Sequence, residues 1–126
     1  MKYEDIVRSK EILEFYERGS AILDELGYTD HSPIHTKVVA EKAADILKAF
    51  GYDQKTIDLA KIAGFMHDIG NAINRHHHAE YGALLADDIL KEMDCELSDR
   101  IRIVSAIANH DESDGVPAAE AHEKTP

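Results

Sequence analysis

Eight histidines accompany a single cysteine, Cys95, in this chain of 126 residues. Imidazole nitrogens together with carboxylate oxygens suit divalent ions such as Mn, Fe, Co, Ni or Zn, and one cysteine offers no set of thiolates as an alternative. A metal site built from helices needs ligands at the inward-facing positions of several of them. Four histidines meet this condition because they lie in register with apolar stripes of helical period, namely His35, His67, His78 and His110.

The clearest case is His78, which precedes Gly82, Leu85 and Ile89 by four, seven and eleven positions. Residues at such spacings share one face of a helix. Asp68 directly follows His67 and adds a carboxylate to the set. Without a metal, four inward histidines would repel one another once protonated below about pH 6, or would need many separate polar partners. The pattern therefore favours a metal site over four unrelated core histidines.

Apolar residues of helical period predict five helices and no strand. The first helix covers about residues 4–26, with Gly19-Ser20 as a candidate kink, and the others begin after or at Ser32-Pro33, Asp53, His78 and Ser98. Residues 71–77 form a polar connection, and residues 111–126, with Gly115, Pro117 and Pro126, predict a loop or mobile terminus. Since no repeat or linker divides the chain, we expect a single all-α domain over residues 1–126.

The charge balance limits the partners. Lys and Arg number 14 against 25 Asp and Glu, which gives a net charge of −11. This argues against duplex nucleic acid and against an anionic membrane surface, since both are bound through positive charge. No apolar run approaches the roughly 18 residues of a spanning helix, and the residues after Met1 do not form a signal peptide. A cytoplasmic protein without an intrachain disulfide is expected.

Four segments together resemble the HD-domain metal-dependent phosphohydrolases: His35-Thr-Lys-Val38, Ala63-Gly-Phe-Met-His67-Asp68-Ile69-Gly70, His78-Ala-Glu-Tyr-Gly82 and Ile107-Ala-Asn-His110. The adjacent His-Asp inside an apolar helix that ends in Ile-Gly is the specific element. The resemblance covers about residues 30–115. It implies an HD-like helical bundle that binds one or two divalent metal ions through His, His-Asp and a later Asp, with further histidines for a second ion.

Carried over to this chain, the resemblance implies that His35, His67 and Asp68 hold a first ion and that His78 and His110 hold a second, with Asp68 shared between them. His78 is preferred over its neighbour His77 as the ligand. The ions implied are Mn, Fe, Ni, Co, Zn or Mg. The implied activity is hydrolysis of a phosphomonoester, nucleotide or phosphodiester by a metal-bridging hydroxide, with Asp68 catalytic and a small, nucleotide-like phosphorylated substrate.

The chain departs from the family pattern at several positions. Asn71 stands where many members carry a lysine that meets phosphate, and Arg75 is a substitute cation. No helix is readable after His110 to carry the family's final metal-binding Asp, so either Asp111 or Asp114 replaces it or the natural protein continues beyond residue 126. The remaining candidates for residues around the metal or substrate are His31, Asn71, Arg75, His77 and Asp111.

Two other functions remain open at this point. Some HD-domain proteins resemble di-iron oxygenases, and the same helical cage would suit that chemistry. A non-catalytic module that senses nucleotides or metals is the other alternative. Residues 109–117 also resemble part of a cyclic-dinucleotide phosphodiesterase motif, but Asn109 replaces a histidine of that motif and its Gly-Tyr-Pro is absent, so they identify no substrate.

Overall fold

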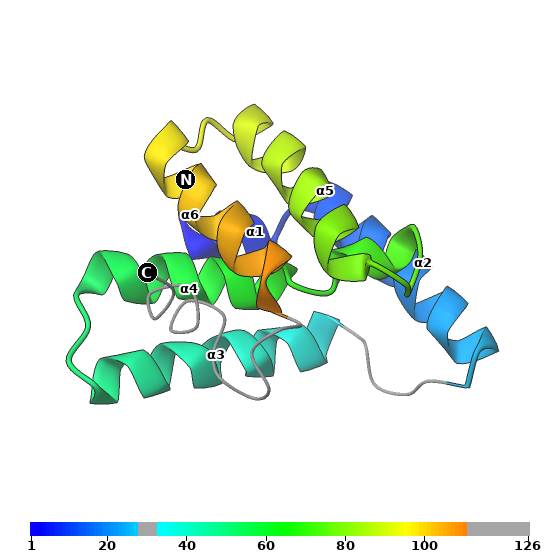
Figure 1. Cartoon of the computed structure of the whole chain (residues 1–126), viewed down its shortest axis with the longest axis horizontal. Helices are drawn as coiled ribbons and strands as arrows, with labels where there is room; N and C mark the ends of the chain where they lie inside the picture. Colours follow the sequence, from blue (N-terminus) through cyan, green and yellow to red (C-terminus); the bar gives the residue numbers. More distant parts are fainter. Residues whose placement is uncertain (28–32, 111–126) are drawn as a thin grey trace.

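The computed structural model describes residues 1–27 and 33–110, and within these ranges the chain is all-α (Figure 1). The all-α prediction is confirmed. The described residues form six α-helices and one 3₁₀ helix instead of about five helices: α1 (Tyr3–Val7), α2 (Lys10–Glu25), α3 (Pro33–Ala49), α4 (Gln54–Met66), η1 (Ile69–Ala72), α5 (His78–Glu92) and α6 (Leu97–Ala108). The loop expected over residues 111–126 lies outside the described residues.

The additional helix arises because the segment predicted as one first helix forms two helices, α1 and α2. The chain breaks at Arg8 and Ser9, where the Ser9 hydroxyl accepts a hydrogen bond from the backbone N–H of Ile12 and caps α2. The helix then continues without interruption through Gly19-Ser20, where the kink was expected. Gly19 has a packing role instead, since a Cβ there would lie 3.2 Å from the backbone nitrogen of Ala72 in η1.

Helices α3 and α4 form an antiparallel pair along one side of the molecule (Figure 1). The helix start predicted at Asp53 is confirmed, since the Asp53 carboxylate accepts from the backbone N–H of Thr56 and caps α4. The two helices approach closely at Gly64, where a Cβ would lie 3.0 Å from the Cα of Ala40. This antiparallel register places His35, near the start of α3, at the same end of the pair as His67, which follows α4.

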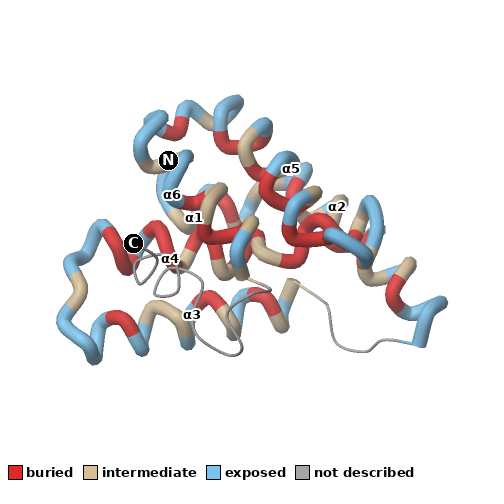
Figure 2. Tube along the Cα trace, viewed as in Figure 1, coloured by how far each residue is buried: buried red, intermediate tan, exposed pale blue. Residues whose placement is uncertain are grey.

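The core surrounds α4. Figure 2 shows buried positions along α4 where α3 lies on one side and α1 and α6 on the other. A helix that is covered on several sides carries apolar residues around most of its circumference, and α4 buries Thr56, Ile57, Leu59, Ala60, Ile62, Ala63, Phe65 and Met66. Packing on several sides therefore anchors the end of α4, and His67 directly follows it.

The expected core stripe of α3 is partly wrong. The apolar period of this segment predicts that Val38, Ile46 and Phe50 face the core, but these residues are 43%, 40% and 71% exposed. The buried residues of α3 are Thr36, Ala40 and Leu47, because the helix packs on α4 through small side chains at the Gly64 approach. Among the described helices, none is both long and apolar enough to cross a membrane.

Candidate metal centre

The His67-Asp68 pair lies just past the end of α4, which stops at Met66, and η1 begins at Ile69. In a longer helix, the carbonyls of Gly64 and Phe65 would accept from the N–H groups of residues 68 and 69. Here these two carbonyls accept hydrogen bonds from side chains instead. Nδ1 of His67 donates to the Gly64 carbonyl at 2.6 Å, and the Tyr16 hydroxyl donates to the Phe65 carbonyl. The Ile69-Gly70-Asn71 segment is typical of a helix stop, but α4 ends three residues before it, so His67 and Asp68 lie outside the helix.

His78 reaches this site because η1 and α5 touch backbone to backbone. A Cβ on Gly70 would lie 1.9 Å from the carbonyl oxygen of His78 and 2.6 Å from the nitrogen of Gly82. No side chain fits there, so glycine is required at position 70. Helix α5 begins at His78, as the sequence predicted.

The three consecutive histidines diverge at His77, which has a left-handed backbone with φ of 61°. His76 and His77 are exposed, and Nδ1 of His77 lies 2.8 Å from Oε2 of Glu80, also exposed. The side chain of His78 is 7% exposed and points inward. His78, and not His77, is therefore the member of the run that lies beside Asp68.

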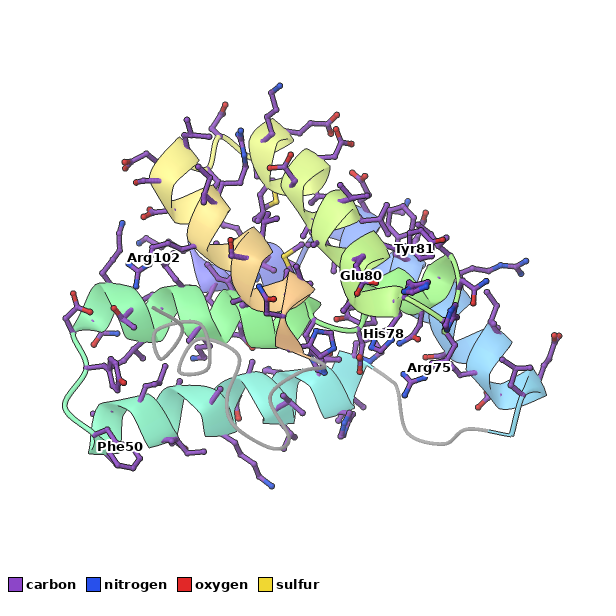
Figure 3. All side chains as sticks on the ribbon, viewed as in Figure 1. Phe50, Arg75, His78, Glu80, Tyr81 and Arg102 are labelled. Atoms are coloured by element: carbon purple, nitrogen blue, oxygen red, sulfur yellow. The ribbon has the colours of Figure 1, made fainter. Side chains whose placement is uncertain are left out.

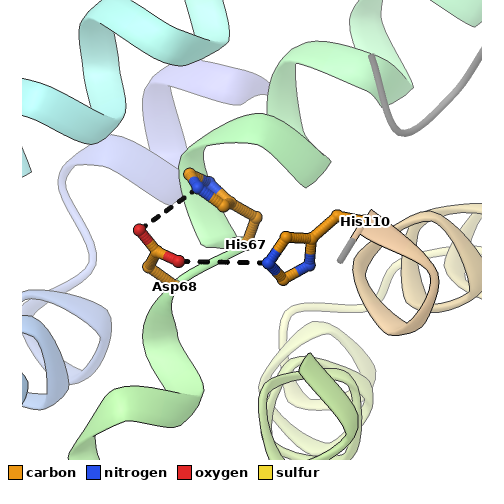
Figure 4. A group of neighbouring side chains, drawn as sticks. All are labelled: His67, Asp68 and His110. Carbon is orange, nitrogen blue, oxygen red and sulfur yellow. Dashed lines mark ion pairs between the residues drawn. The ribbon is translucent and has the colours of Figure 1, made fainter. Parts of the chain in front are cut away.

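Three imidazoles from separate parts of the chain surround the Asp68 carboxylate. Nε2 of His67 lies 3.2 Å from Oδ2, while Nε2 of His78 lies 3.4 Å and Nε2 of His110 lies 4.0 Å from Oδ1. His110 follows the end of α6, and Figure 4 shows it facing Asp68 opposite His67. Ligand atoms of His67, Asp68 and His110 all lie within 4.8 Å of one another, so these three residues are close enough to bind one ion.

The hydrogen bonds fix which nitrogens face the centre. Nδ1 of His67, His78 and His110 each lies 2.6–3.0 Å from the carbonyl oxygen three residues earlier. A carbonyl only accepts, so each Nδ1 carries a proton, and each Nε2 is left to face the centre, where it donates to Asp68 when the ring is charged and offers a lone pair when the ring is neutral. Backbone bonds of this kind are typical of histidines that bind metals. Imidazole nitrogens and a carboxylate are ligands that divalent metal ions accept, so the donor set fits a divalent metal ion.

Electrostatics keep Asp68 ionised. Burial alone would raise the pKa of this carboxyl, which is 7% exposed, but hydrogen bonds from His67 and His78 and the charge of these groups outweigh burial and hold the pKa well below its usual range. The carboxylate is thus available as an anionic ligand. Its two oxygens face different imidazoles, which suits a carboxylate shared between two groups.

The other predicted site residues fall into three groups. His35 is half-buried at the same end of the α3–α4 pair, but it does not belong to the cluster of His67, Asp68 and His110, and its ligand role stays a prediction. His77 faces solvent. His31 and Asp111 lie outside the described residues, as does Asp114.

Asn71 and Arg75 lie next to the centre. Asn71 is 2% exposed, and its Nδ2 donates to the carbonyl oxygen of Asp68 at 3.0 Å. Its Oδ1 accepts from Nη1 of Arg75 at 3.4 Å. Asn71 is thus buried beneath the site instead of extending into it, as a phosphate-binding lysine would.

The apolar stripe of residues 4–26 predicts Tyr16 as a packing residue, but Tyr16 also makes a polar contact. Its side chain is buried, and its hydroxyl bonds to the Phe65 carbonyl two residues before His67. Burial and the nearby Asp68 charge raise the pKa of Tyr16 well above its ordinary value of 10.0, so the hydroxyl stays a donor. A tyrosine in an apolar stripe is the sequence signal for such a contact, because a buried hydroxyl needs a hydrogen-bond partner.

Comparison with known proteins finds a family whose match includes the candidate metal centre. The family model described as HD domain matches residues 33–124. An uncharacterized protein of Methanocaldococcus jannaschii, MJ1020, is 27% identical over 108 residues, which covers 74% of this chain and 42% of that protein. The chain thus matches less than half the length of this relative. No solved structure matches significantly.

Proposed function

Because the chain belongs to the HD-domain family, most of whose members are metal-dependent phosphohydrolases, we propose that it hydrolyses a small phosphorylated substrate with the help of a divalent ion. One observation carries the proposal: the Nε2 atoms of His67, His78 and His110 converge on an ionised Asp68 while backbone carbonyls hold each Nδ1. This donor set suits Mn, Fe, Co, Ni or Zn, and Mg remains among the candidates from the family.

His67, Asp68 and His110 would hold the ion, with His78 beside them. A divalent ion in this position supplies Lewis-acid chemistry, since it acidifies a water molecule and neutralises charge that builds up on a phosphoryl group. We further propose that His35 joins His67 and Asp68 around one ion and that His78 and His110 hold a second. The two oxygens of Asp68, which face His67 on one side and His78 and His110 on the other, support its role as the shared, catalytic ligand.

A bound divalent ion would also explain how an acidic protein can act on anionic substrates. A chain of net charge −11 repels phosphate esters unless a local cation reverses the field. A divalent ion at Asp68 provides that reversal where the substrate would bind. A nucleotide-like substrate is compatible with this field, and so is any other small phosphate ester.

The test is elemental analysis of protein purified without chelator, followed by assays on phosphomonoesters, nucleotides and cyclic dinucleotides with Mn, Ni and Mg. We expect bound metal and metal-dependent release of phosphate or of a mononucleotide. Asp68→Ala should lose both, whereas Asp88→Ala, an exposed carboxylate on α5, should keep both. Iron-containing protein that consumes oxygen and is inert to every ester would indicate the oxygenase alternative. Metal-dependent nucleotide binding without turnover would indicate the sensing module.

A further inference from the structure

We propose that Arg75 binds the phosphate group of the substrate, that Asn71 positions it, and that the site thereby prefers phosphate monoesters to diesters. The inference rests on the proposed phosphohydrolase function. It begins from Asn71, which stands directly after the Ile69-Gly70 turn but is 2% exposed. An amide buried to this extent does not contact a ligand in the site, so its effect on an anion must pass through another residue.

That residue is Arg75, because Asn71 connects it to the backbone of the metal centre. The Asn71 side chain donates to the carbonyl oxygen of Asp68 at 3.0 Å and accepts from Nη1 of Arg75 at 3.4 Å. The Asn71 side chain thus links the guanidinium of Arg75 to the main chain of Asp68.

The main chain of Arg75 is attached to the same centre. Its carbonyl oxygen accepts from Nδ1 of His78 at 3.0 Å, and this bond directs Nε2 of His78 toward Asp68. Figure 3 shows Arg75 and His78 together at the start of α5. Hydrogen bonds thus hold both the guanidinium and the main-chain carbonyl of Arg75. Arg75 is half-buried, so its side chain keeps access to solvent. A guanidinium presents a planar fork of N–H donors that matches two oxygens of one phosphate group.

The charges favour a monoester. Arg75 adds one positive charge beside the metal centre at Asp68. A phosphate monoester carries close to two negative charges at neutral pH, because its second pKa is about 6, whereas a diester carries one. The arginine thus matches the additional negative charge of a terminal phosphate.

The experiment compares metal-loaded wild-type protein with Arg75→Gln, Arg75→Lys and a control, Arg8→Gln, which removes an exposed arginine at the end of α1. Calorimetry measures the binding of inorganic phosphate, and elemental analysis measures bound metal. We expect Arg75→Gln to keep its metal and to bind phosphate at least about tenfold more weakly, because a charge-assisted, forked contact is lost. Arg75→Lys should recover part of the affinity, and Arg8→Gln should match wild type.

Steady-state assays extend the test to substrates. For Arg75→Gln, KM for p-nitrophenyl phosphate should rise by a factor similar to the loss of phosphate affinity, while KM for bis(p-nitrophenyl) phosphate should change much less. Asn71→Ala should weaken phosphate binding in the wild-type background but add little to Arg75→Gln, since the amide acts through the guanidinium. A purely structural role of Asn71 would give additive losses instead.

Phosphate binding by Arg75→Gln that equals wild type, or loss of metal in this variant, would overturn the assignment of Arg75. Equal KM increases for the monoester and the diester would overturn the preference for monoesters. If wild type binds phosphate through Arg75 but hydrolyses no ester, the proposed function fails and the anion site stands. If wild type hydrolyses esters and Arg75→Gln does so with unchanged KM, only the Arg75 assignment fails. A metal-loaded wild type that does not bind phosphate would contradict the anion site itself.

Discussion

Nε2 of His78 and Nε2 of His110 lie 3.2 Å apart, although His78 begins α5 and His110 follows α6. Both rings use Nδ1 to donate to a carbonyl, from Arg75 in one case and Ile107 in the other. Two neutral rings held in this way would direct lone pairs at each other, which is unfavourable for two buried polar atoms. A proton on one Nε2 or a metal ion bound to both nitrogens removes the conflict, so the contact fits a metal ion bound between the two rings.

Removal of the metal should lower the melting temperature. Binding to the folded state alone stabilises a protein by about 2.7 kcal/mol at a hundredfold excess of ligand over Kd, which corresponds to about 10 °C for a domain of this size. We expect dialysis against a chelator to cause a decrease of that order and Mn²⁺ to reverse it, as measured by calorimetry. Equal melting temperatures for the treated and reloaded protein would contradict the metal centre.

The run His76-His77-His78 offers an internal comparison. His78→Ala should weaken metal binding more than about tenfold, because it removes a nitrogen that faces Asp68. His76→Ala should leave the affinity unchanged, since His76 is exposed. Competition with a chromophoric chelator measures both affinities. A greater loss in His76→Ala than in His78→Ala would show that α5 starts in a different register from the one described.

Gly70→Ala should be strongly destabilising because a Cβ would lie 1.9 Å from the carbonyl oxygen of His78, in backbone that cannot move aside as a side chain can. We expect a loss of about 3 kcal/mol or more in the free energy of unfolding, measured by urea denaturation, and weaker metal binding as α5 shifts. Gly19→Ala is the matched control, since its nearest atom would be 3.2 Å away and the expected loss is smaller. Similar stability for the two variants would contradict the close contact of η1 with α5.

The sequence predicted the parts of the site that depend on helical period. His78 shares a face with the buried Gly82 and Ile89, and His110 follows the buried Ile107 by three positions, so both histidines were expected to point inward. The period did not distinguish the faces of α3, because apolar residues such as Val38 and Phe50 continue onto its exposed side. Contacts between distant segments were also inaccessible. The Tyr16 hydroxyl meets a carbonyl 49 residues away, and no local pattern encodes such a partner.

That long-range contact gives a final prediction. Tyr16→Phe removes the donor to the Phe65 carbonyl and leaves a buried acceptor without this bond, which should cost about 1–3 kcal/mol in the free energy of unfolding. Because Phe65 lies two residues before His67, the end of α4 should loosen and metal affinity should also fall. Tyr81→Phe, at a half-buried tyrosine on α5, is the control and should change neither property. Urea denaturation and metal titration measure the two effects separately. Loss of stability with unchanged metal affinity would show that Tyr16 supports the core alone, whereas loss of both would show that it also holds His67 and Asp68 in place.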